Sequence, residues 1–175
     1  MEQFLEQIKS YVGALNKFVA LHQLPEEWFN KPDHVAIKGK DGADFARLIE
    51  LFRPHSFQIT SVIMNKRRLA SVQINGSINI GRFGEVSWVE IMEPRPEKAG
   101  KDVVGFEHAE FLFPNFDAAR LILDDKKVPY EMQENPGHKW INIVINGGGQ
   151  ELKLNNKLLM DTVKEEIDTG KAFLL

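Results

Sequence analysis

Two histidines in matching sequence contexts are the residues of this chain best suited to chemistry. His34 follows an aspartate in the segment Asp-His-Val-Ala-Ile at 33–37, and His108 follows a glutamate in Glu-His-Ala-Glu-Phe at 107–111. Each is followed later in the chain by a glutamate within an apolar run, Glu90 after the first and Glu151 after the second. A histidine and a glutamate that recur on predicted strands indicate four ligands converging on one divalent metal ion.

This ligand set restricts the metal and the chemistry. Two neutral imidazoles and two carboxylates suit Zn, Ni, Mn, Co or Fe(II), and the sequence does not choose among them. Four protein ligands leave two positions of an octahedral ion for a substrate with adjacent oxygens, whose enolate the ion would stabilise as a Lewis acid. Glu90 or Glu151, if it releases the metal, is a candidate base for a proton next to a carbonyl. The set therefore favours an isomerase or a lyase.

Two alternatives stay open. His34, His108 and Glu151 without Glu90 form a triad that fits an Fe(II) dioxygenase. A protein that binds a metal or a metabolite without catalysis would use the same residues, so whether the chain is an enzyme is not fixed, although we lean towards one.

Further polar residues are candidates for contact with the substrate. Glu110 lies two residues beyond His108 and therefore points to the same side of its strand, as a partner of the ligands or a substrate contact. Lys38 and Lys153 are candidates to hold an anionic group, and Asn142 lies on the polar side of its strand. The alternative for each is an ordinary solvated side chain on an exposed strand face.

The periodicity of apolar residues predicts the elements that would position these groups. Residues 3–22 form an amphipathic helix, and 24–32, with two prolines, form a linker. An order of strand, helix and three strands then occurs twice. The first unit has strands at 33–38, 57–64, 69–74 and 86–92 and a helix at 42–52; the second has strands at 106–113, 130–134, 140–146 and 151–154 and a helix at 117–126; a last helix covers 158–169.

We therefore predict one α+β domain over 1–175, built from two βαβββ modules that form a cupped mixed sheet. An N-terminal helical extension covers 1–32, the modules cover 33–95 and 105–156, and a C-terminal helix and tail cover 157–175. The stretch 75–84 is ambiguous between hairpin and loop, and 94–105, rich in proline, glycine and charge, is expected to link the modules. One sheet face is aliphatic and suited to packing against helices. The other mixes the key polar groups with aromatic residues and predicts a ligand pocket, the alternative being a half-solvated sheet.

Composition excludes several classes of protein. The 175 residues carry a net charge of −3, which shows no basic surface for nucleic acid or anionic membranes. Cysteine is absent, which excludes disulfides and thiolate metal sites. Charges interrupt the first apolar residues, so we expect no signal peptide, and no run reaches the length of a membrane span. A cytoplasmic protein with a small-molecule ligand is the resulting expectation, either a monomer or a homodimer formed through the N-terminal helix.

Three segments resemble the vicinal oxygen chelate superfamily, which includes glyoxalase I, methylmalonyl-CoA epimerase and the extradiol dioxygenases. They are Val-Glu-Ile-Met-Glu-Pro at 89–94, Gly-Phe-Glu-His at 105–108 and Gln-Glu-Leu at 150–152. Asp-His-Val at 33–35 together with Gly-Phe-Glu-His-Ala-Glu at 105–110 is similar to the YecM-like family within it, over roughly residues 1–170. The resemblance implies a glyoxalase-like fold with metal ligands at His34, Glu90, His108 and Glu151, although YecM-like proteins do not require a carboxylate at the last of these positions.

Overall fold

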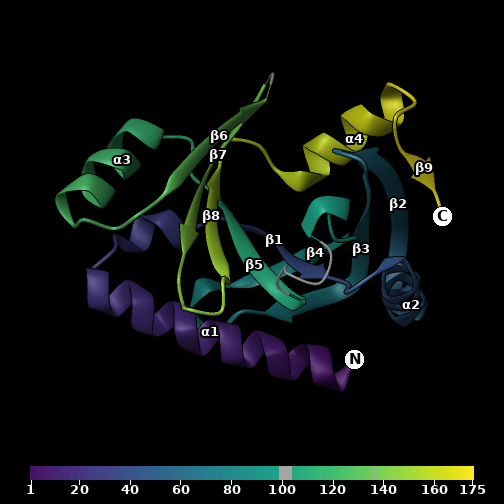
Figure 1. Ribbon diagram of the computed structural model, residues 1–175, viewed down its shortest axis with the longest axis horizontal. Coiled ribbons are helices and arrows are strands. Elements are labelled where there is room, and N and C mark those ends of the chain that lie inside the picture. The colour runs from purple at the N-terminus through teal and green to yellow at the C-terminus, as the bar shows by residue number, and fades with distance from the viewer. Residues whose placement is uncertain (99–103, 136) are drawn as a thin grey trace.

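A computed structural model describes residues 1–98, 104–135 and 137–175 of the chain. Within these residues the strands join into one mixed sheet in the order β6-β7-β8-β5-β1-β4-β3-β2-β9 (Figure 1). The strands are β1 (Pro32–Lys38), β2 (Ser56–Met64), β3 (Arg67–Asn79), β4 (Glu85–Met92), β5 (Gly105–Leu112), β6 (Glu131–Asn135), β7 (His138–Val144), β8 (Glu151–Asn155) and β9 (Phe173–Leu174). The helices are α1 (Glu2–His22), α2 (Gly42–Phe52), α3 (Phe116–Asp125) and α4 (Leu159–Asp168).

The sheet consists of the same βαβββ arrangement built twice. In the first half β1 runs parallel to β4, and β4, β3 and β2 follow as antiparallel neighbours. In the second half β5 runs parallel to β8, and β8, β7 and β6 follow in the same way. The halves join through the antiparallel pair of β1 and β5, so the first strands of both modules lie at the centre of the sheet. The α+β architecture of two βαβββ modules in one mixed sheet, expected from the sequence, is therefore confirmed.

Helices α1, α2 and α3 pack against the aliphatic side of the sheet, whereas α4 packs against the polar side that forms the cup. The apolar stripe of α1, including Phe4, Ile8 and Leu15, is buried, and α1 contacts β5. Figure 1 shows α1 running beneath the sheet, whereas α4 lies on the opposite side, above its first half. Asp41 and Asn115 accept hydrogen bonds from backbone amides at the starts of α2 and α3, which fixes where both helices begin.

Several segments differ from the sequence expectation. The linker at 24–32 contains a 3₁₀ turn at Glu26–Phe29 whose Trp28 and Phe29 are buried in the core. The ambiguous stretch 75–84 extends β3 to Asn79 and then forms a turn. Two short additions are a 3₁₀ turn at Pro96–Lys98 in the inter-module linker and the edge strand β9 on β2; residues 99–103 of that linker lie outside the described residues. No helix in the described parts of the chain is long and apolar enough to cross a membrane.

Candidate metal centre

Strand register at the middle of the sheet brings the key residues of both modules together. Ala36 on β1 pairs with Glu90 on β4 at one side and with His108 on β5 at the other. His34, two residues earlier on β1, pairs with Glu110 on β5. Since residues two apart on a strand share a face, all four polar side chains project into the cup. The small side chain of Ala36 leaves space between them.

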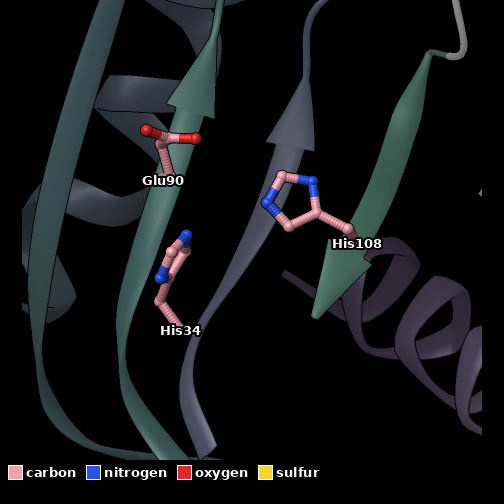
Figure 2. Close-up of side chains that lie close together, drawn as sticks. All are labelled: His34, Glu90 and His108. Carbon is pink, nitrogen blue, oxygen red and sulfur yellow. The ribbon is translucent and has the colours of Figure 1, made fainter. Parts of the chain in front are cut away.

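Three of the four predicted ligands form a compact group. His34, Glu90 and His108 each offer one ligand atom, and these atoms all lie within 4.8 Å of one another. Figure 2 shows the three side chains reaching into the same space from neighbouring strands. His34 is 4% exposed and His108 is fully buried, while Glu90 is half-buried. His34, Glu90 and His108 therefore have the spacing that a metal site requires.

Glu110 is closer to the histidines than the sequence analysis expected. Its Oε2 lies 3.6 Å from Nε2 of His34 and 3.6 Å from Nε2 of His108. Its other oxygen accepts a hydrogen bond of 2.5 Å from the amide of Asn155 on β8. Burial opposes ionisation of Glu110, but the positive charge of His34 and that of Lys153 outweigh it and lower the pKa of this carboxyl to about 2. Glu110 is thus an ionised group between both imidazoles, and Asp33, His34 and Glu110 form a second group with metal-ligand spacing.

Each histidine also has a carboxylate at its Nδ1 atom, and alternation along the strands did not predict this. The register of β1 and β5 shifts twice, with Asp33 as the extra residue on β1 and Glu107 as the extra residue on β5. Such bulges turn a side chain that alternation would send to the opposite face. Asp33 Oδ2 lies 3.0 Å from Nδ1 of His34, and Glu107 Oε2 lies 3.3 Å from Nδ1 of His108.

Further contacts hold these two carboxylates in place. Asp33 accepts hydrogen bonds from the side-chain amide of Asn155 at 3.1 Å and from the backbone amide of Leu159, the first residue of α4, at 3.0 and 3.1 Å. Glu107 forms a buried ion pair with Lys38. Carboxylates that orient the second nitrogen of a metal-binding histidine are a common feature of metal sites. In the sequence, this orienting role was indicated by the acidic residue directly before each histidine, Asp33 or Glu107.

The two imidazoles differ in charge. Burial alone would lower the pKa of His34, but the charges of Glu110, Asp33 and Glu90 outweigh it and raise the pKa to about 9. Burial, together with the nearby positive charge of Lys153, lowers the pKa of His108. Glu107 is the neighbour of Nδ1 of His108, whereas the buried Nε2 has no hydrogen-bond partner in the described structure. A metal ion at Nε2 would satisfy this nitrogen, so the donor set fits a divalent cation.

The fourth predicted ligand, Glu151, lines the same cavity but does not join either group with metal-ligand spacing among the described residues. It pairs with His108 in the register of β5 and β8. Burial, together with the negative charge of Glu107, raises the pKa of Glu151 above its ordinary value.

The residues predicted to contact substrate also line this cavity, whose volume is about 570 Å³. Lys153 pairs with Glu110 on one side and with Asn142 on the other. The buried Oδ1 of Asn142 has no hydrogen-bond partner in the described structure, and Lys38 is in the ion pair with Glu107. The cavity is also lined by Trp140 and by His138, and the sequence analysis did not assign His138 to a site. Its size is that of a site for a small metabolite.

Comparison with known proteins establishes the fold and leaves the family open. The sequence matches no family model and no curated protein. A solved structure of a structural-genomics protein called EC4020 has a TM-score of 0.76 at 16% identity, over 94% of this chain and 92% of that one. Methylmalonyl-CoA epimerase from Mycobacterium tuberculosis has a TM-score of 0.53 at 18% identity, over 76% and 91%. The hypothetical protein BH1468 from Bacillus halodurans C-125 has a TM-score of 0.50 at 14% identity, over 73% and 94%.

Proposed function

We propose that this protein is a divalent-metal-dependent isomerase or lyase of the vicinal oxygen chelate type, related to the YecM-like family and active on a small molecule in the cytoplasm. The observation that carries the proposal is the group formed by His34, Glu90 and His108, with Glu110 between the imidazoles. Its fold, shared with a methylmalonyl-CoA epimerase, supports the same reading. When bound, a divalent ion would supply a Lewis acid that stabilises negative charge developing on a substrate oxygen.

The residues of the cup would have different roles around such an ion. His34, Glu90 and His108 would hold it, and Asp33 and Glu107 would fix the orientation of the two imidazoles. Zn, Ni, Mn, Co and Fe(II) all accept these donors, so the metal remains to be identified.

Glu151 is the residue we assign as general base. It lies in the cavity outside the group with metal-ligand spacing, so its carboxylate is available to a substrate. Its raised pKa makes it a stronger base than an ordinary glutamate, as proton abstraction next to a carbonyl requires. Lys153 and Asn142, its neighbours on the cup floor, would contact substrate oxygens.

His34, His108 and Glu90 also form a His-His-Glu triad, so an Fe(II) dioxygenase with Glu90 in the place that the sequence analysis gave to Glu151 is a second candidate function. A non-catalytic protein that binds a metal or metabolite would use the same group and is the outcome to be distinguished by experiment.

Elemental analysis of the purified protein tests the metal site. We expect one transition-metal ion for each chain in the wild type, and its loss in His34→Ala and in His108→Ala. His55→Ala removes an exposed histidine that does not line the cavity and should keep the metal. No metal in the wild type, even after incubation with Zn, Ni, Mn and Fe(II), would contradict the proposal.

The catalytic part has a separate test. Metal-loaded protein is incubated in deuterated water with small 2-oxo acids and their esters, and exchange of the proton next to the carbonyl is followed by NMR. We expect exchange that Glu151→Gln abolishes without loss of the metal. Retention of the metal with no exchange on these compounds would favour the non-catalytic binding protein.

A further inference from the structure

Six of the seven arginines of this protein fall into two sets. Several make ion pairs with carboxylates near the surface: Arg47 with Asp44, Arg53 with Glu50, Arg68 with Glu93 and Arg82 with Glu26. Arg67 and Arg95 form no side-chain hydrogen bond or ion pair with any residue that the structure describes, and both line the cavity of the metal centre. Two unpaired cations in a cavity otherwise rich in carboxylates call for a partner from outside the chain.

Of these two arginines, Arg67 shows more clearly that a hydrogen-bond partner is missing. Its Nε is buried and has no hydrogen-bond acceptor in the described structure. Leaving a buried donor of a charged group unsatisfied costs free energy, which native proteins usually avoid. An oxyanion is the partner that removes this cost best, because guanidinium donates two parallel hydrogen bonds to a carboxylate or a phosphate.

Strand register places Arg67 at one end of the cup. Ser71 on β3 pairs with Glu90, and Leu69 pairs with Met92, which in turn pairs with Lys38. Arg67 is two residues beyond Leu69 on the same face of β3, which puts its backbone about 13 Å along the strand from Ser71. The Arg67 side chain lines the same cavity as the histidines' neighbours Asp33 and Glu110. Arg67 is therefore displaced from the metal centre by a distance that a small substrate can span.

Arg67 and Arg95 bring two positive charges to this cavity. The carboxylates Asp33, Glu90 and Glu110 gather around the histidines, and Glu166 on α4 also lines the cavity. Glu107, which approaches this end, is neutralised by its ion pair with Lys38. Arg95 follows β4 beyond Met92 and joins Arg67 in lining the cavity.

We propose that Arg67 and Arg95 form a subsite for an oxyanion, a carboxylate or a phosphate group, at the end of the substrate remote from the histidines. The inference rests on the proposed function, because the metal would bind one end of the substrate and the two arginines would bind the other end. The substrate class becomes a small anionic metabolite whose paired oxygens lie at one end and whose charged group lies at the other.

Anion binding to metal-free protein isolates this subsite from the metal. Metal is first removed with a chelator, and the chelator is then removed by desalting. Inorganic phosphate and malonate are titrated separately into this protein by isothermal titration calorimetry. We expect binding of one or both probes to the wild type. Arg67→Gln and Arg95→Gln should each weaken it at least about 10-fold, the loss typical of a charged hydrogen bond.

The neighbouring arginine provides a matched control. Arg68→Gln makes the same change of charge one residue away, on the side chain that pairs with Glu93 outside the cavity, and should leave the affinity unchanged. Arg67→Lys keeps the charge but loses the planar fork, and should bind with intermediate affinity. Circular dichroism of each variant shows that folding is retained.

The outcomes separate this subsite from the metal site. No binding of either probe to folded wild type, or an equal loss in Arg68→Gln, would overturn the anion subsite. Metal content measured on the same preparations tests the metal site alone. Stoichiometric metal without anion binding would leave the proposed function and remove the subsite. Anion binding that depends on Arg67, in a protein that retains none of the metals tested, would support the subsite and contradict the proposed function.

Discussion

The two histidines have the same neighbours in the sequence and different electrostatics in the fold. His34 has a carboxylate at each ring nitrogen, Asp33 at 3.0 Å and Glu110 at 3.6 Å, and its pKa rises to about 9. His108 is fully buried and feels the charge of Lys153, so its pKa falls. In the metal-free protein His34 is then a cation that balances its carboxylates, while His108 is neutral. The stability that His34 contributes is complete below its unfolded pKa of about 6.5 and is lost as pH rises through about 9.

This difference predicts that zinc binding near neutral pH releases close to one proton. His34 is protonated before binding and must lose its proton to coordinate a metal. Glu107 and Glu110 have lowered pKa values and are already ionised, and the lowered pKa of His108 leaves it neutral, so these groups release none. Phenol red in weakly buffered solution measures the release, which should fall towards zero as pH rises past about 9.

His34→Gln serves as the control for proton release, because it removes the titrating group and leaves His108 in place. Residual zinc binding by this variant should occur with little release. Release that is independent of pH between neutrality and about 10 would contradict the assigned charge of His34.

Glu110 gives a second prediction at the scale of a residue. Its oxygen lies 3.6 Å from Nε2 of both histidines, so it either coordinates the metal or supplies negative charge beside it. Glu110→Gln should lower zinc affinity about 10- to 100-fold, the range found for groups that support metal ligands. Competition with a chromophoric chelator measures the affinity. Glu131→Gln removes a more exposed carboxylate from the same cavity and should have little effect; a gain of affinity in Glu110→Gln would show that Glu110 blocks the site.

At the scale of the element, strand alternation was sufficient to predict that His34, Glu90 and His108 share a face. It failed for Asp33 and Glu107, because each is the extra residue of a bulge and turns towards the cup. A bulge depends on the pairing of two strands that are distant in the sequence, so one strand's pattern does not reveal it. The buried turn at Glu26–Phe29 was missed for a similar reason, since its aromatic residues pack against segments far along the chain.

The N-terminal helix contributes to the site through one hydroxyl. Tyr11 Oη accepts a hydrogen bond of 3.0 Å from the backbone amide of Ala109 on β5 and donates one of 2.8 Å to the backbone carbonyl of Glu151 on β8. Tyr11 is fully buried, and burial raises its pKa well above the ordinary value, so the hydroxyl stays neutral. Helix α1 thus links the two strands that carry His108 and Glu151.

Tyr11→Phe should therefore destabilise the protein by about 1–3 kcal/mol, because it leaves the Ala109 amide and the Glu151 carbonyl without their partner. Urea unfolding measures the change. Tyr130→Phe removes an exposed hydroxyl that bonds Asp124 and should cost much less. Equal stability of the two variants would show that the buried hydroxyl is not needed between β5 and β8.

At the scale of the whole molecule, the candidate metal site lies where the two modules meet. His34 and Glu90 belong to the first module and His108 to the second, and the antiparallel pair of β1 and β5 holds them together. The duplication visible in the sequence thus puts two members of the group in the first module and one in the second. A metal at this place would link the modules directly and would bind the folded chain far better than the unfolded one.

This arrangement predicts a large thermal stabilisation by metal. A ligand that binds only the folded state stabilises it by about 2.7 kcal/mol at about 100 times its dissociation constant. For a chain of this length that corresponds to a rise in Tm of about 5–10 °C. Differential scanning calorimetry with and without zinc measures the shift, which His108→Ala should abolish and His55→Ala should retain. An equal shift in His108→Ala would mean that zinc acts elsewhere on the molecule, because that variant lacks the ligand that the second module contributes to the group.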